Sequence, residues 1–234
     1  RGLSGKVAVV TGGAQGLGEA ITRRLSEEGC EVWLLDVNPL GSDAARAIEQ
    51  RTGYPVRFIR TDIGNENSLH ETVNQIRERS GKVHILVNNA AAFVFKGVDA
   101  TREDWDRILD VNVKGTSFVT QMIVPLMRAA GGGSIVNLSS VSGFIGQEQF
   151  ATYNATKFAI RGLAKCWAMD LAPDNIRVNT VCPGYIKTDA FVNSCLQVGK
   201  DPDEEDRRVS KLHLLGRQGL PEEVAGAVAF LSSD

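Results

Sequence analysis

The sequence predicts an α/β protein built on a doubly wound parallel β-sheet with helices on both faces, in a single domain over residues 1–234. Three observations support this prediction. Short apolar, β-rich runs alternate with stretches of helical periodicity. A glycine-rich turn joins the first predicted strand to the first predicted helix. Polar or glycine residues follow the ends of four strands, where ligands bind in open parallel sheets.

The first strand and its turn predict a phosphate-binding site. Residues 6–10 (KVAVV) read as a buried strand, and residues 11–18 (TGGAQGLG) lead directly into a helix. Glycines let the backbone approach a ligand closely, and the helix N-terminus offers unpaired N–H groups to a phosphate. The spacing is G-x-x-x-G-x-G rather than the commoner G-x-G-x-x-G. A flexible turn without a ligand is the alternative interpretation.

The second strand, residues 31–36, ends on Asp36, 18 residues after Gly18. An acidic residue at this point is typical of a site that hydrogen-bonds an adenosine ribose 2′-OH, and its charge would repel a 2′-phosphate. Residues 11–18 contain no Lys or Arg, and Val37 and Asn38 are uncharged. We therefore expect NAD rather than NADP. A polar strand end or helix cap is the alternative role for Asp36.

Four further strands are predicted over residues 56–60, 83–87, 134–139 and 176–181, with helices over 68–79, from 101, over 116–128 and from 221. Asp62 and Asn88 fall at strand ends, in register with Asp36 and the glycine-rich turn. Thr101 is a plausible N-cap with Asp104 as its partner. We expect Pro125 to kink the helix that contains it. Residues 189–215 are irregular and charged, which is typical of a mobile lid.

Ser140 to Lys157 form the chemically most informative stretch. On a helix, Tyr153 and Lys157 project from the same face because they are four residues apart. An ammonium beside a phenol lowers the phenol pKa from about 10, so that the phenol can exchange a proton with an alcohol oxygen. Ser140, just past a strand end, could hold that oxygen. A surface helix pair without chemistry is the alternative.

Asn112 lies near the end of the helix from 101, where an Asn competes with backbone hydrogen bonds. A local kink is the simplest explanation for an Asn at this position.

Composition excludes several classes of function. The chain has 43% hydrophobic and 23% charged residues and a net charge of −2, which gives no electrostatic case for a nucleic acid or an anionic membrane. No apolar run reaches the ~18 residues of a membrane span, and no signal peptide is visible. The three His are too scattered for a metal site. The four Cys have no C-x-x-C spacing, so we expect reduced thiols in a cytoplasmic protein.

From Lys6 to Ser233 the chain resembles the short-chain dehydrogenase/reductase family. The resemblance rests on TGGAQGLG at 11–18, Asp36, Asp62, NNA at 88–90, Asn112, Ser140, YNATK at 153–157 and PGYIKT at 183–188. It implies an oxidoreductase with a Rossmann-type NAD(P)-binding domain that transfers a hydride between NAD and a secondary alcohol or ketone. The family pattern also selects Ser140 over Ser139 and Ser142.

The resemblance implies a role for each matching residue. Tyr153 would be the general acid/base, Lys157 would lower its pKa and bind the nicotinamide ribose, Ser140 would orient the substrate oxygen, and Asn112 would hold a water in a proton relay with Lys157. The implied cofactor-binding residues are Gly12, Gln15, Gly16, Leu17, Gly18, Asp36, Asp62, Ile63, Asn88, Ala90, Tyr153, Lys157, Pro183, Gly184, Ile186 and Thr188.

Two departures from the family pattern stand out. Ala91 replaces a Gly, which narrows the cofactor cleft slightly and removes no reacting group. The sequence also stops at Asp234, before the family's last strand. The resemblance implies a homo-oligomer, a tetramer or a dimer.

Two other functions remain open at this point: an NADP-dependent ketoreductase acting on acyl-carrier thioesters, and a catalytically silent dinucleotide-binding protein. We expect Phe93, Phe144, Gln147 and residues 189–215 to shape the substrate pocket. Steroids, sugars, polyols and cyclic alcohols all remain candidate substrates.

Overall fold

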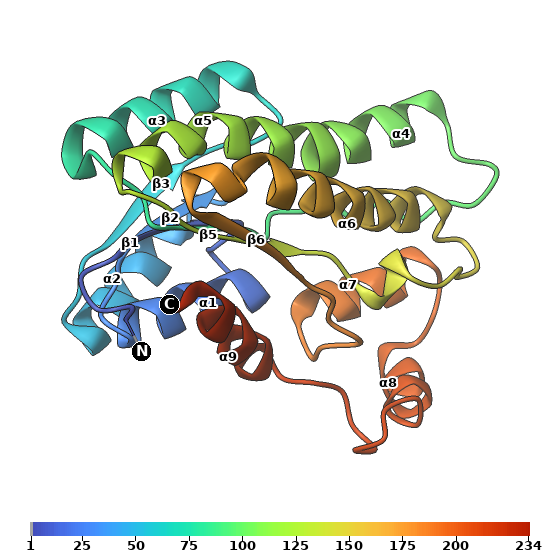
Figure 1. The fold of residues 1–234 in the computed structure, drawn as a ribbon. Coiled ribbons are helices and arrows are strands. Elements are labelled where there is room, and N and C mark those ends of the chain that lie inside the picture. Colours follow the sequence, from blue (N-terminus) through green and yellow to red (C-terminus); the bar gives the residue numbers. More distant parts are fainter. Residues whose placement is uncertain (1) are drawn as a thin grey trace.

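The structure is a computed structural model that describes residues 2–234, and it is organised around one parallel sheet of six strands in the order β3-β2-β1-β4-β5-β6 (Figure 1). The strands are β1 Val7–Thr11, β2 Glu31–Asp36, β3 Val56–Arg60, β4 Ile85–Asn88, β5 Gly133–Leu138 and β6 Ile176–Val181. The helices are α1 Gly16–Glu27, α2 Gly41–Thr52, α3 Glu66–Ser80, α4 Arg102–Leu109, α5 Thr116–Ala129, α6 Ala151–Leu171, α7 Asp189–Gln197, α8 Pro202–Ser210 and α9 Pro221–Ser232.

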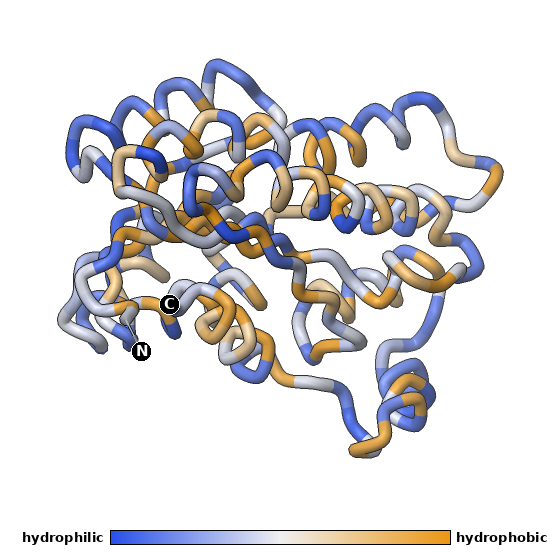
Figure 2. Tube along the Cα trace, in the orientation of Figure 1, coloured by the Kyte–Doolittle hydropathy of each residue, from blue (hydrophilic) through white to orange (hydrophobic). Residues whose placement is uncertain are grey.

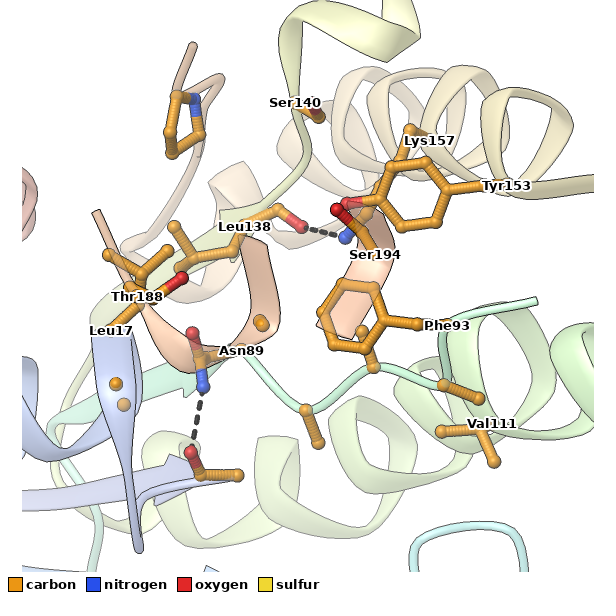
Figure 3. A pocket seen from close by; sticks show the side chains of 18 of the residues that line it. Leu17, Asn89, Phe93, Val111, Leu138, Ser140, Tyr153, Lys157, Thr188 and Ser194 are labelled. Carbon is orange, nitrogen blue, oxygen red and sulfur yellow. Dashed lines mark hydrogen bonds between the residues drawn. The ribbon is translucent and has the colours of Figure 1, made fainter. Parts of the chain in front are cut away.

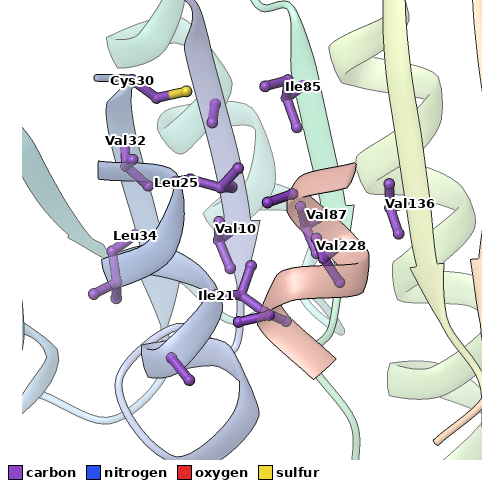
Figure 4. Packing of buried hydrophobic residues seen from close by; sticks show 14 of the residues in the cluster. Val10, Ile21, Leu25, Cys30, Val32, Leu34, Ile85, Val87, Val136 and Val228 are labelled. Atoms are coloured by element: carbon purple, nitrogen blue, oxygen red, sulfur yellow. The ribbon is translucent and has the colours of Figure 1, made fainter. Parts of the chain in front are cut away.

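Side-chain alternation along the strands produces two hydrophobic cores, one on each face of the sheet. On β1, Ala8 and Val10 face α1, α2 and α9, whereas Val7 and Val9 face α3, α5 and the end of α6. Figure 4 shows the first core, where Ile21 of α1 and Val228 of α9 pack over Val10. Hydropathy follows the same division, with apolar strands inside and polar outer helix surfaces (Figure 2). The predicted doubly wound fold is confirmed.

The strand order places the point of reversal between β1 and β4, which are adjacent although α1 to α3 and two strands separate them in the chain. Connections from these two strands run to opposite faces, which opens a crevice beyond their carboxyl ends. Because all six strands are parallel, the segments after β1, β2, β4, β5 and β6 reach the same edge of the sheet. The fold therefore assembles the predicted site from residues far apart in sequence.

The predicted irregular stretch over residues 189–215 is wrong in part, because it contains α7 and α8. Each helix has an N-cap that sequence periodicity does not show: Thr188 accepts from Phe191 N, and Asp201 accepts from Asp203 N and Glu204 N. The predicted cap of α4 is confirmed, with Thr101 and Asp104 forming a reciprocal capping box. Within residues 2–234, no helix has the length and apolarity to cross a membrane.

Candidate active site

A cavity of about 640 Å³ lies at the carboxyl edge of the sheet, within the usual size range of small-molecule and cofactor sites (Figure 3). Its walls come from the segments after β1, β2, β3, β4, β5 and β6, together with residues of α6 and α7. Every catalytic or cofactor-binding residue predicted from the sequence lines this cavity except Asn88 and Asn112.

The glycine-rich turn is packed so tightly that side chains are excluded from it. A Cβ on Gly18 would lie 1.8 Å from Gly12 O, and one on Gly12 would lie 2.7 Å from Ala90 Cα. Gly12 also has a positive φ of 65°. The turn therefore brings bare backbone to the cavity, and the N-terminus of α1 opens beside it. This cradle fits the diphosphate of a dinucleotide.

Asn88 does not line the cavity, and the expectation that it would do so is wrong. It is the last residue of β4, and its side chain points into the core, where Nδ2 donates to Thr120 Oγ1 (3.0 Å) and Asn137 Oδ1 (2.8 Å). Asn89, which the sequence reasoning missed, faces the cavity and donates from Nδ2 to Thr11 O (3.0 Å) and Gly12 O (2.9 Å). Strand alternation is the signal that distinguishes the two neighbours.

Asp36 lies at the far end of the cavity from Tyr153's helix, at the end of β2. Its two carboxylate oxygens accept from backbone N–H groups, Oδ2 from Ala14 N (3.0 Å) and Oδ1 from Asn38 N (2.9 Å). These bonds fix a negative charge beside the glycine-rich turn. Asp62 follows β3 and caps its own loop by accepting from Gly64 N (2.9 Å). Arg60, the last residue of β3, also lies at this edge, and its Nε donates to Val37 O (3.2 Å).

Tyr153 and Lys157 project from α6 toward the end of β5 (Figure 3). Lys157 is 5% exposed; its Nζ lies 5.4 Å from the centroid of the Tyr153 ring and donates to Leu138 O (2.9 Å). Ser140 accepts at Oγ from Ser142 N (3.1 Å), so its own hydroxyl proton is free to be donated into the cavity. The Ser140, Tyr153 and Lys157 side chains thus place three protic groups at one end of the cavity.

Burial governs the charge state of this pair. It raises the pKa of the Tyr153 phenol above its usual value, while the Ser140 hydrogen bond lowers it in part. Burial also lowers the pKa of Lys157 to about 8. The expected lowering of the Tyr153 pKa by Lys157 is therefore not found, because loss of solvation outweighs other influences on the phenol. At neutral pH the site holds a protonated phenol, which is the acid form.

Asn112 lies in a π-helical segment, Asp110–Gly115, between α4 and α5. Its side chain is 2% exposed and fully engaged: Oδ1 accepts from Ala92 N (2.7 Å), and Nδ2 donates to Ala92 O (3.1 Å) and Thr156 Oγ1 (3.2 Å). The amide therefore ties the loop after β4 to α6 and does not itself reach the cavity. A wide π turn of this kind often occurs at functional sites.

Aromatic side chains surround Tyr153. Its ring centroid lies 5.8 Å from Phe93, 5.3 Å from Phe95 and 6.5 Å from Phe150, all of which line the cavity. Phe95 was not foreseen, because nothing in the sequence places its loop beside α6. Phe150 was also missed, although its position three residues before Tyr153 is a signal that it lies near that ring. Phe144 is absent from the cavity wall, contrary to expectation: it is 56% exposed and packs under Arg161, whose Cζ is 3.4 Å from the ring centroid.

Comparison with known proteins identifies close relatives. A family model described as enoyl-(acyl carrier protein) reductase matches residues 12–234. A cyclopentanol dehydrogenase of Comamonas testosteroni is 41% identical over 234 residues, covering 99% of this chain and 91% of the relative. Human dehydrogenase/reductase SDR family member 4 is 38% identical over 234 residues, covering 99% and 82%.

Solved structures agree with the fold. L-Sorbose reductase from Gluconobacter frateurii, complexed with NADPH and L-sorbose, superposes with a TM-score of 0.94 at 31% identity, covering 100% of this chain and 91% of that one. An NAD⁺-bound xylitol dehydrogenase superposes with a TM-score of 0.93 at 33% identity, covering 100% and 94%. Both NADPH and NAD⁺ thus occur among the structural neighbours.

Proposed function

The chain belongs to the short-chain dehydrogenase/reductase family, and from this premise we propose that it interconverts a secondary alcohol and its ketone with NAD as the hydride carrier. The observation that carries the proposal is the convergence of Tyr153, Ser140 and Lys157 on one end of a cavity whose other end is a glycine cradle. The names of the relatives, which include an alcohol dehydrogenase and sugar or polyol oxidoreductases, support the same reaction class.

Tyr153, Ser140 and Lys157 have separate roles in the proposed reaction. NAD supplies the hydride chemistry when it is bound. In ketone reduction, the Tyr153 hydroxyl gives its proton to the substrate oxygen, and in alcohol oxidation the phenolate takes that proton back. Ser140 donates its hydroxyl proton to the same oxygen and stabilises negative charge there. The buried Lys157 ammonium stabilises the phenolate once it forms.

Asp36 supports the choice of NAD over NADP. Its carboxylate is fixed by two backbone N–H groups beside the glycine-rich turn, where it can accept a hydrogen bond from a ribose 2′-OH. An NADP-dependent ketoreductase is the second candidate, favoured by the exposed Arg60 near the same strand ends and by the NADPH-bound neighbour. The two candidates differ in cofactor and share one site.

The direct test compares the parent protein with Tyr153→Phe and with Tyr54→Phe, a control at an exposed tyrosine outside the cavity. Nicotinamide reduction at 340 nm is followed with NAD and a panel of secondary alcohols. We expect Tyr153→Phe to lose about 10²- to 10⁴-fold in kcat, and Tyr54→Phe to match the parent. Equal turnover by all three proteins would remove Tyr153 from its role. Tight NAD binding without turnover of any alcohol would favour a silent binding protein.

We also propose that residues 1–234 form one cooperative domain, and that the protein is cytoplasmic and assembles into a homotetramer or dimer. Exposed apolar side chains on α5 and α6, including Phe118, Phe158 and Met169, support self-association. Four free cysteines within the described residues support a reducing compartment. Light scattering of the purified protein tests the assembly, and a monomer at micromolar concentration would contradict it.

A further inference from the structure

A chain of hydrogen bonds leads from the reacting end of the cavity to a second hydroxyl group. Ser142 N donates to Ser140 Oγ (3.1 Å), and Ser142 Oγ donates to Gln147 Oε1 (2.5 Å). Gln147 Nε2 then donates to Tyr185 Oη (3.2 Å). All four residues line the same cavity. The polar wall therefore runs without interruption from Ser140 to Tyr185.

The direction of these bonds determines what Tyr185 offers to a ligand. In the structure the Gln147 amide presents its carbonyl to the Ser142 hydroxyl, which donates, and its NH₂ to Tyr185. The Tyr185 oxygen thus accepts a hydrogen bond, and its own proton is left to donate. Arg208, a cation near this phenol, has only hydrogen-bond donors and cannot accept that proton. Tyr185 is therefore a hydrogen-bond donor aimed at an acceptor in the cavity.

The Tyr185 ring is held in place from two sides. It makes edge-to-face contacts with Phe191 of α7 (centroids 6.2 Å apart) and with His213 (6.0 Å). His213 is itself fixed, because its Nδ1 lies 3.0 Å from Val209 O. Tyr185 is thus positioned by α7 and by the turn after α8, the segment in which the sequence suggested only a mobile lid.

The loop that carries Gln147 is anchored from behind. Arg161 of α6 donates to Gly143 O and packs on Phe144, and Asn154 donates from Nδ2 to Ile145 O (2.7 Å). Gln149 has a positive φ of 61°, a left-handed conformation that is uncommon for a non-glycine residue. Such strained positions gather at functional sites. Here the turn directs Gln147 and Phe150 of one loop into the cavity together.

One wall of the cavity is aromatic and another is polar, and together they define a substrate class. The rings of Phe93, Phe95 and Phe150 surround Tyr153 and favour an apolar carbon skeleton at the reacting carbon. Ser140 and Tyr185 provide two separate donors along the polar wall. We propose that the preferred substrate is an alicyclic diol or hydroxyketone, in which Ser140 and Tyr153 hold the reacting oxygen and Tyr185 holds a second oxygen. This inference rests on the proposed dehydrogenase function.

The test compares cyclohexane-1,3-diol with 3-methylcyclohexanol, a partner of similar size that lacks the second oxygen. The diol has two reactive hydroxyls, so its kcat/KM is first divided by about two. With NAD, we expect the corrected kcat/KM for the diol to exceed that for the methyl compound by about tenfold, which is the value of one additional hydrogen bond. The preference should appear mainly in KM, because Tyr185 contacts an oxygen that does not react.

Two variants test the donor directly. Tyr185→Phe removes the phenol oxygen, and Gln147→Glu replaces the NH₂ donor by a carboxylate oxygen that accepts the Tyr185 proton and so consumes it. Both should abolish the diol preference, which is measured in each variant as the ratio of kcat/KM for the diol to that for 3-methylcyclohexanol. Glu148→Gln, in the same loop but outside the cavity, is the control and should keep the preference. Thermal melting verifies that each variant folds.

The outcomes separate this inference from the function on which it rests. Turnover of both alcohols without a preference for the diol would overturn the role of Tyr185 and leave the dehydrogenase intact. A preference that survives both Tyr185→Phe and Gln147→Glu would also overturn it. Absence of turnover with any alcohol or ketone would refute the proposed function itself, and the substrate class with it.

Discussion

Replacing Asp36 with Asn should shift cofactor preference from NAD toward NADP. The carboxylate is fixed beside the glycine-rich turn by Ala14 N and Asn38 N, so it cannot swing away from a 2′-phosphate. Asn has nearly the same shape and keeps one acceptor oxygen. The substitution therefore removes the charge while it preserves most of the local geometry.

The magnitude follows from Coulomb's law. A carboxylate and a phosphate group of charge about −1.5, about 5 Å apart, repel each other by about 1.2 kcal/mol at the dielectric constant of water and by about 5 kcal/mol at an effective value of 20. Removing the carboxylate charge should thus raise the ratio of kcat/KM for NADP to that for NAD by a factor between about 10 and a few thousand. Arg60, exposed at the same strand ends, is then available to attract the 2′-phosphate.

The assay measures kcat/KM for both cofactors with one alcohol at fixed ionic strength, since charge interactions are screened by salt. Asp43→Asn on the exposed surface of α2 makes the same change in net charge away from the cavity and should leave the ratio unchanged. Adding Arg60→Ala to Asp36→Asn should reverse part of the gain. A parent enzyme that already prefers NADP, or a change in the ratio below about threefold, would refute the reasoning.

Gly18→Ala should weaken NAD binding at least tenfold and destabilise the protein by about 1–3 kcal/mol, because the new Cβ would lie 1.8 Å from Gly12 O. Gly162→Ala on α6 places its Cβ in open space and should raise Tm instead. Binding calorimetry and thermal melting of both variants check this reasoning. Lys157→Met should abolish turnover and yet stabilise the fold at pH 7 by up to about 3 kcal/mol, because the pKa of Lys157 is lowered to about 8 from about 10.4 when unfolded. The cost of burying the Lys157 charge acts in full below pH 8 and disappears as the pH rises from about 8 to 10.4. Urea titrations should therefore show the stability advantage of Lys157→Met shrinking across that window. A constant advantage from pH 7 to 10.4 would contradict the lowered pKa.

Sequence patterns captured what depends on local chemistry. The glycine turn, Asp36 and the Tyr153–Lys157 pair each have a local signal, namely a strand-to-helix turn, a strand end and a four-residue helical spacing, and all of them line the cavity. The errors occurred where tertiary packing decides. Asn88 and Asn89 differ only in which side of a strand end they face. Phe144 lies outside the cavity because Arg161 of α6 packs on its ring. The caps of α7 and α8 lie in a polar stretch without hydrophobic periodicity, so the two helices gave no signal.

The electrostatic state of the Tyr153 site could not be derived from spacing alone. Four-residue separation correctly places Lys157 beside Tyr153, but the degree of desolvation also depends on Phe95 and Leu138, which come from other segments of the chain. Burial therefore reverses the direction expected for the phenol pKa. The Asn112 side chain illustrates the same limit, because its partner Ala92 belongs to a loop twenty residues earlier.

The parallel sheet has a consequence for how such an enzyme can diversify. The adenosine end of the cavity is built from residues 12–63, whereas the wall that carries Ser142, Gln147 and Tyr185 comes from residues 140–194, and the two sets share no hydrogen-bond partner. Changes at separate, uncoupled positions contribute independently to free energy. Cofactor preference and substrate preference should therefore change independently of each other, so that the effects of Asp36→Asn and Gln147→Glu multiply.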